Sequence, residues 1–158
     1  MNTYLIVKWL HVASSVLLVG TGFGSAFYLF FANRSSSLEA RGVIARLVVR
    51  ADLWFTTPAA VAQPLTGAWL AHAAGWPLTT PWLLLSAALF LLAGICWLPV
   101  LWLQSRMACE VEAACAQRRP LTATYRRWQA AWEWLGYPAF VAMLAVFFLM
   151  VNKPQLWA

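Results

Sequence analysis

Residues 12–32 read VASSVLLVGTGFGSAFYLFFA and contain no charged side chain. At about 1.5 Å per residue, a helix of this length crosses the roughly 30 Å hydrocarbon core of a bilayer. The apolar character begins near residue 4, so the first predicted span covers residues 4–32. The amino end has no basic cluster, and the run is too long for an ordinary signal peptide. We therefore expect this span to be retained.

The rest of the chain has the same apolar character. Of its 158 residues, 63% are hydrophobic and only 10% are charged, whereas a soluble domain carries about a quarter charged residues. The sequence therefore predicts an all-α membrane protein, an antiparallel bundle of four transmembrane helices that forms one domain over residues 1–158. The predicted spans cover residues 4–32, 53–75, 82–103 and 130–151.

The basic residues indicate the orientation of the spans. Every arginine lies in one of two connecting segments, residues 33–52 and 104–129, whereas the connection 76–81 has no charge. Basic residues concentrate in cytoplasmic loops, so we predict a bacterial inner-membrane protein with both termini in the periplasm. The net charge of +6 then reflects contact with anionic lipid rather than with nucleic acid.

The tryptophans are placed as two interfacial belts would require. Such belts anchor membrane proteins at the two headgroup regions. The predicted outer belt consists of Trp9, Trp69, Trp76, Trp82 and Trp157. The predicted inner belt consists of Trp54, Trp102, Trp128, Trp132 and Trp134.

Only two histidines are present, and both fall near the outer ends of predicted spans. His11 lies about two turns inside span one and His72 about one turn inside span two, so their depths differ by about 5 Å. Two imidazoles in one leaflet suit a shared metal ion or haem, and both residues are therefore candidate metal ligands. The alternatives are a hydrogen-bonded helix-interface histidine at position 11 and a solvated one at position 72.

Small and polar residues recur beside His11 along the first span. The residues Ser14, Ser15, Gly22 and Ser25 follow at helical spacing. Small residues let helices approach closely or leave room for a flat ligand. We therefore include Ser15 and Gly22 among the candidate cofactor-binding residues. Lys8 joins them as a partner for an anionic group such as a haem propionate, although a lysine here can also snorkel to the headgroups.

The remaining polar residues favour structural roles. Gln63, near the middle of span two, needs a buried partner and is typical of helix packing. Glu133 is predicted to pair with Arg126 or Arg127, with a proton-relay role as the alternative. Glu110 and Glu112 are expected to pair with loop arginines. The three cysteines form no CxxC or CxxCH motif, which favours reduced thiols.

Several short stretches resemble a superfamily of small membrane proteins. Residues 8–11, KWLH, resemble the opening of the first span in CopD-type copper-resistance proteins and HemJ-type protoporphyrinogen oxidases. Residues 63–70, QPLTGAWL, followed by PWL at 81–83, are similar to the same group. Residues 148–154, FLMVNKP, resemble an uncharacterised branch of it, described only as predicted integral membrane protein.

The HemJ-type resemblance implies b-type haem and electron transfer from a porphyrinogen, and it extends to Lys8 and His11. That family tends to carry a histidine and a lysine just after the tryptophan that opens span three. Here Trp82 is followed by Leu83, Leu84, Leu85 and Ser86. The resemblance therefore does not extend to protoporphyrinogen oxidase activity.

These observations lead to one functional expectation and two alternatives. The expectation is a small inner-membrane protein that binds haem b, either transferring electrons or serving as a subunit of a redox assembly. Its partners would be the lipid bilayer together with a membrane redox partner or a second copy of the chain. One alternative is a non-redox accessory or binding subunit. The other is copper handling through His11, which lacks support from a methionine-rich outer segment.

Overall fold

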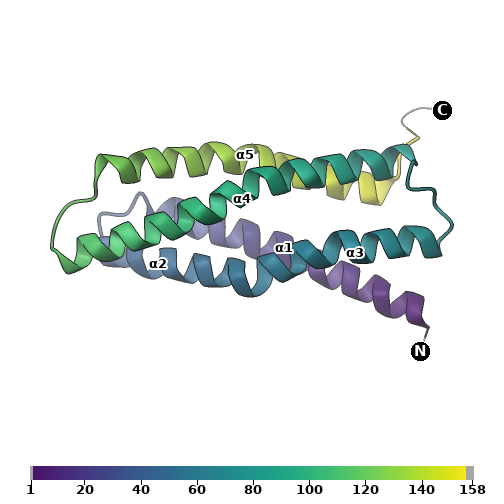
Figure 1. Cartoon of the computed structure of the whole chain (residues 1–158), viewed down its shortest axis with the longest axis horizontal. Helices are drawn as coiled ribbons and strands as arrows, with labels where there is room; N and C mark the ends of the chain where they lie inside the picture. Colours follow the sequence, from purple (N-terminus) through teal and green to yellow (C-terminus); the bar gives the residue numbers. More distant parts are fainter. Residues whose placement is uncertain (1, 156–158) are drawn as a thin grey trace.

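The computed structural model describes residues 2–155, which form long helices joined by short connections (Figure 1). No strand occurs in these residues, which confirms the all-α fold class. The elements in chain order are α1 (Thr3–Ala32), α2 (Leu38–Ala51), the π-helical turn η1 (Asp52–Thr56), α3 (Thr57–Ala73), α4 (Pro81–Ala116) and α5 (Ala123–Asn152).

The connections are sorted between the two ends of the bundle. Figure 1 shows both termini and the α3–α4 connection at one end, and the α1–α2 and α4–α5 connections at the other. We call the second the arginine-rich end, because every arginine of the chain lies in or near its two connections. The helix starts at this end are capped by Ser37 and Thr122, whose hydroxyls accept from backbone N–H groups.

Three helices in the described part of the chain are long and apolar enough to cross a membrane, namely α1, α4 and α5. The predicted second span, residues 53–75, is instead divided between η1 and α3. Helix α3 has 17 residues, which corresponds to about 26 Å and falls short of a roughly 30 Å core. The structure thus shows three helices that are long enough to cross a membrane. The second predicted span is not one helix but a composite of two elements.

That composite element is a continuous helical run through α2, η1 and α3. The sequence predicted residues 33–52 only as a connection, but most of them form α2. Ala45 and Val48 lie on one face of α2 and are buried in the core. Glu39 in the first turn of this run interacts favourably with the helix dipole. Residues 33–52 therefore belong to the folded bundle.

The core is concentrated toward the arginine-rich end. Helix α4 has 36 residues, or about 54 Å, so it continues well past its predicted limit at residue 103. Met107 and Val111 of this extension are fully buried, as is Tyr125 at the start of α5. They pack with α2 and with the end of α1. This cluster holds the helices together beyond the apolar part of the bundle.

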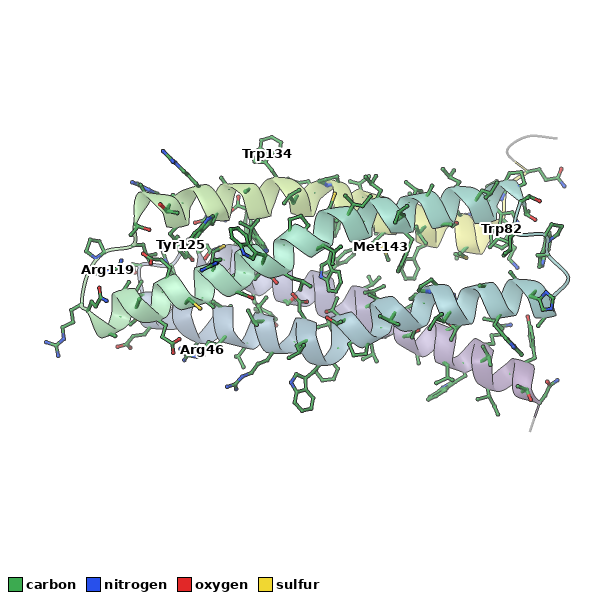
Figure 2. All side chains as sticks on the ribbon, viewed as in Figure 1. Arg46, Trp82, Arg119, Tyr125, Trp134 and Met143 are labelled. Atoms are coloured by element: carbon green, nitrogen blue, oxygen red, sulfur yellow. The ribbon has the colours of Figure 1, made fainter. Side chains whose placement is uncertain are left out.

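The outside of the bundle is covered by large apolar side chains, as a lipid-facing surface requires. Val16, Leu65 and Val141 are each more than half exposed. Trp134 projects away from α5 (Figure 2). In contrast, Trp82 and Trp132 from the two predicted belts are buried. Trp157 lies outside the described residues.

Candidate functional site

The contact between α1 and α3 contains a polar network centred on His11. The ring Nδ1 of His11 lies 2.8 Å from Thr66 Oγ1. The amide of Gln63 donates to the His11 carbonyl at 2.7 Å and to Ser14 Oγ at 2.6 Å. The Ser14 hydroxyl in turn donates to the His11 carbonyl at 3.0 Å. Gln63 therefore has the interhelical partners that its position in an apolar helix requires.

The surroundings of His11 select one tautomer of the neutral ring. The Thr66 hydroxyl donates its single proton to the Ala62 carbonyl at 2.6 Å, so its lone pair accepts from His11 Nδ1–H. This leaves Nε2 with a lone pair and no hydrogen-bond partner within residues 2–155. Gly67 makes room for the ring, because an added Cβ there would lie 3.2 Å from His11 Cε1.

The other predicted cofactor residues lie apart from this network. His72 and Lys8 are exposed, and Ser15 donates to the carbonyl of Val12 on its own helix. At about 100° per residue, His72 lies roughly 140° around α3 from the Gly67 surface that meets His11. The structure therefore brings His11 beside Gln63 and Thr66 rather than beside His72.

A cavity of about 610 Å³ lies between the helices, within the size range of small-molecule sites. It is open to the outside of the bundle, because its lining residues Phe27 and Tyr137 are more than half exposed. Side chains from α1, η1, α3, α4 and α5 line it, and most of them are apolar or aromatic. Gly22 is a lining residue, about 16 Å along α1 from His11. Met143, also a lining residue, is labelled between the two helical layers in Figure 2. The cavity and the His11 network are thus separate sites.

One wall of the cavity carries a buried polar group formed by Asp52, Thr56 and Gln104. Their exposed fractions are 3%, 3% and 4%. Thr56 and Gln104 lie beside the carboxyl of Asp52, yet Thr56 Oγ1 and Gln104 Oε1 have no hydrogen-bond partner in the described part of the protein. Each such atom costs roughly 1–3 kcal/mol when left unpaired. An unsatisfied buried group calls for an explanation, and these two belong to residues on the wall of a cavity.

Two of these residues share a wall because they lie four residues apart, about one helical turn, at the two ends of the π-turn η1. In the π-helical turn η1, backbone hydrogen bonds join residues five apart rather than four. The Thr57 hydroxyl also donates to the Asp52 carbonyl at 2.8 Å. Asp52 and Thr56 are both buried while the residues between them are exposed. Such turns are rare and occur frequently at functional sites.

The second carboxylate that lines the cavity is Glu133, and its predicted partners were wrong. Arg34 binds both of its oxygens, at 3.0 and 3.1 Å, and the Arg34 guanidinium also lies 3.4 Å from the Phe30 ring centroid. Arg126 and Arg127, the predicted partners, are exposed. The predicted pairing was wrong because α1 ends beside α5 and places Arg34 next to Glu133. Distance along the sequence does not reveal this contact.

Glu110 and Glu112 pair with arginines at the arginine-rich end, as predicted. Glu110 binds Arg119 at 2.8 and 3.2 Å, and Glu112 lies 3.9 Å from Arg46. The hydrogen bonds from Arg119 lower the pKa of Glu110 to about 2. Cys96, Cys109 and Cys115 are free thiols, as expected.

The residues present do not form a haem or metal centre in the cavity. No histidine is among its lining residues, so a histidine-ligated haem does not fit there. Within residues 2–155 no three His, Cys, Asp or Glu side chains cluster in a way that could hold a metal ion. A haem held by His11 would have to lie at the α1–α3 contact instead.

The polar wall was not identified from the sequence, although two signals point to it. Asp52 immediately precedes the second apolar run, and Gln104 immediately follows the third. Each position also suits an ordinary interfacial residue. Their convergence depends on how α4 crosses η1, which no local pattern encodes.

Comparison with known proteins gives one match. The model of a family described as predicted integral membrane protein (DUF2269) matches residues 5–154. The match covers both the His11 network and the cavity. No curated protein and no solved structure matches the chain significantly.

Proposed function

Because this chain belongs to the DUF2269 family of predicted integral membrane proteins, we propose that it binds an apolar, lipid-like molecule between its transmembrane helices. The observation that carries the proposal is the cavity of about 610 Å³ between the helices, which opens to the outside of the bundle. Sites of this size, with mostly apolar walls and a few polar groups, are typical of small-molecule binding. In a bilayer, the molecules most available to such a cavity are themselves apolar.

The packing of the bundle supports an occupant. Where such a cavity is empty, its walls forfeit the dispersion contacts that an occupant would make. Aromatic side chains such as Phe23, Phe90 and Phe140 line this void. A bound apolar molecule would restore those contacts.

The proposal includes four membrane spans, with both termini in the periplasm of a bacterium. The composite of η1 and α3 serves as the second span, because residues 53–73 contain no Asp, Glu, Lys or Arg. Together, the 5 residues of η1 and the 17 of α3 reach about 33 Å, enough for a roughly 30 Å core. In Figure 1 this composite runs from the middle of the bundle to the end that carries both termini, and α2 continues it to the arginine-rich end.

Two glycines on α1 provide a test of cavity binding. A Cβ added at Gly20 or Gly22 meets nothing within 4 Å, but only Gly22 lines the cavity. Gly22→Phe should fill the cavity, while Gly20→Phe should leave it open. Native mass spectrometry of protein released from membranes should show a bound lipid-like molecule in the wild type and in Gly20→Phe. The bound molecule should be lost in Gly22→Phe. An equal ligand content in all three proteins would contradict the proposal.

A second candidate function is haem b binding at His11, in electron transfer or within a redox assembly. The supporting observation is the Thr66 contact, which leaves His11 Nε2 available as a ligand atom. When bound, haem would supply a one-electron redox centre. Purified protein should then show a reducible Soret and α-band spectrum that is lost in His11→Ala. A colourless protein from haem-supplemented cells would exclude this function.

A further inference from the structure

The charged residues that line the cavity are both acidic, Asp52 and Glu133, and no Lys, Arg or His lies among the described lining residues. Glu133 is neutralised by the two-bonded contact with Arg34. The carboxyl of Asp52 takes part in no ion pair across residues 2–155. The cavity therefore contains one carboxyl group without a cation.

The polar wall presents a surplus of acceptors. Thr56 Oγ1 and Gln104 Oε1 are buried beside the carboxyl of Asp52, and neither atom has a hydrogen-bond partner in the described structure. An isolated carboxylate is expensive to bury unless it is paired and hydrogen-bonded. A ligand that completes this wall must bring N–H or O–H donors, and a positive charge would satisfy all three groups best.

The aromatic walls also suit a cation. The faces of Phe and Trp rings attract positive charge, and Phe30, Trp97 and Trp132 line the cavity. One of these rings already binds a cation, because the guanidinium of Arg34 lies 3.4 Å from the Phe30 centroid. The same walls accommodate an apolar chain.

We infer that the cavity binds an amphiphilic primary amine, with its apolar body among the aromatic side chains and its ammonium group at the polar wall. The inference rests on the proposed ligand-binding function. A primary ammonium carries three N–H donors, which match three acceptors: the Asp52 carboxylate, Thr56 Oγ1 and Gln104 Oε1. Asp52 is the counter-ion, and the other two residues orient the head group.

Three probes with the same apolar chain separate charge from hydrogen bonding. Decylammonium offers charge and N–H donors, decyltrimethylammonium offers charge alone, and decanol offers an O–H donor without charge. Binding is measured by calorimetry on the full chain in phosphatidylcholine nanodiscs, with the heat of empty nanodiscs subtracted. We expect decylammonium to bind roughly tenfold or more tightly than either other probe, as charge-assisted hydrogen bonds imply.

Matched variants test whether the polar wall causes the preference for decylammonium. Asp52→Asn keeps the side-chain shape, and it should reduce decylammonium affinity to that of decanol. Glu112→Gln removes one carboxylate outside the cavity and should leave the affinity unchanged. Thr56→Val should weaken decylammonium binding more than decanol binding.

The outcomes distinguish failure of the inference from failure of the proposed function. If all three probes bind equally in the wild type and Gly22→Phe abolishes their binding, the amine preference is overturned and cavity binding stands. If no probe shows binding that depends on Gly22, both are overturned. Retention of the decylammonium preference in Asp52→Asn would also overturn the role of Asp52 as counter-ion.

Discussion

Gly67 controls how closely the His11 ring approaches α3. A Cβ at this position would lie 3.2 Å from His11 Cε1, so the ring must shift to accommodate any side chain. We expect Gly67→Val to lower the free energy of unfolding by about 1–3 kcal/mol, the usual cost of overpacking. Gly20→Val is the matched control, because a Cβ there meets nothing within 4 Å. Thermal unfolding in detergent, followed by tryptophan fluorescence, measures the difference.

A double-mutant cycle shows whether the cost comes from the imidazole. In a His11→Ala background the ring is gone, so Gly67→Val should cost much less. An undiminished cost in that background would mean that Gly67 serves the α3 backbone rather than the ring.

Tyr125 and Asn33 form a second residue-scale contact, between α5 and the end of α1. The Tyr125 hydroxyl donates to Asn33 Oδ1 at 2.6 Å, and both residues are buried. Tyr125→Phe leaves that oxygen without a partner and should cost about 1–3 kcal/mol of unfolding free energy. Tyr28→Phe, at an exposed position, should be neutral under the same thermal assay. Replacing both partners, in Asn33→Leu with Tyr125→Phe, should recover part of the lost unfolding free energy. If the double variant instead loses the sum of the two single-variant losses, the hydrogen bond does not stabilise the fold.

At the residue scale, the sequence predicted which side chains need a polar partner better than it predicted the partner itself. It identified Gln63 as a group that needs a buried partner and His11 as the histidine within a span. It misassigned Glu133 because the nearest arginines in the sequence are exposed, whereas Arg34 arrives from 99 positions away. The pairing of Asp52 with Gln104 was missed for the same reason.

At the scale of elements, long and mostly apolar runs were sufficient to predict α1 and the membrane parts of α4 and α5. The π-turn was not predictable, because residues 52–56 have no distinctive local pattern, and in the structure the turn packs against α1, which is distant in sequence. Helix α2 was hidden by its arginines, which made residues 33–52 resemble an ordinary connection. Its period is nevertheless that of an amphipathic helix, because Gly42, Ala45 and Val48 lie on a buried face while Arg46 and Arg50 are exposed.

The connection between α4 and α5 gives the fold a dependence on pH. Arg119 lowers the pKa of Glu110 from 4.5 to about 2, so the ionised pair stabilises the folded state. A carboxyl whose pKa is lowered by folding contributes fully above its unfolded pKa and loses that contribution as the pH falls through its folded pKa. The stabilisation by this pair is therefore present above pH 4.5 and disappears between pH 4.5 and about 2.

Thermal melts across that window test the linkage. Glu110→Gln should lower the melting temperature at neutral pH and flatten its fall between about pH 4.5 and 2. Glu112→Gln serves as the control, because its 3.9 Å contact with Arg46 is exposed and worth little. Parallel melting curves for the wild type and Glu110→Gln would show that the pair does not couple to folding.

At the scale of the whole molecule, the cavity is the feature that lay furthest from the sequence. Its walls come from five elements between Leu18 and Met143, and each contributes side chains that, taken alone, are typical of helix packing. Only the manner in which the α1–α3 and α4–α5 pairs meet creates the space. The fold class is thus encoded locally, whereas the candidate site is encoded in the relative placement of helices.

The number of spans is also a property of the whole molecule. Chemical labelling of two connections can determine it. Ser36 lies in the α1–α2 connection and Thr79 in the α3–α4 connection, and both are exposed. A cysteine at each position is introduced in a background where Cys109 and Cys115 are serine. In intact bacterial cells, a membrane-impermeant maleimide should label Thr79→Cys. It should label Ser36→Cys only after permeabilisation, because positive-inside placement puts that connection in the cytoplasm.

The pattern of labelling separates three arrangements of the chain. The expected pattern requires η1 and α3 to cross the bilayer, since only that crossing puts residues 36 and 79 on opposite sides. Labelling of both positions on the same side would mean that the composite does not cross and that α1, α4 and α5 are the spans. Labelling of Ser36→Cys alone in intact cells would keep four spans but reverse them. That reversal would put His11 in the cytoplasmic half of the membrane.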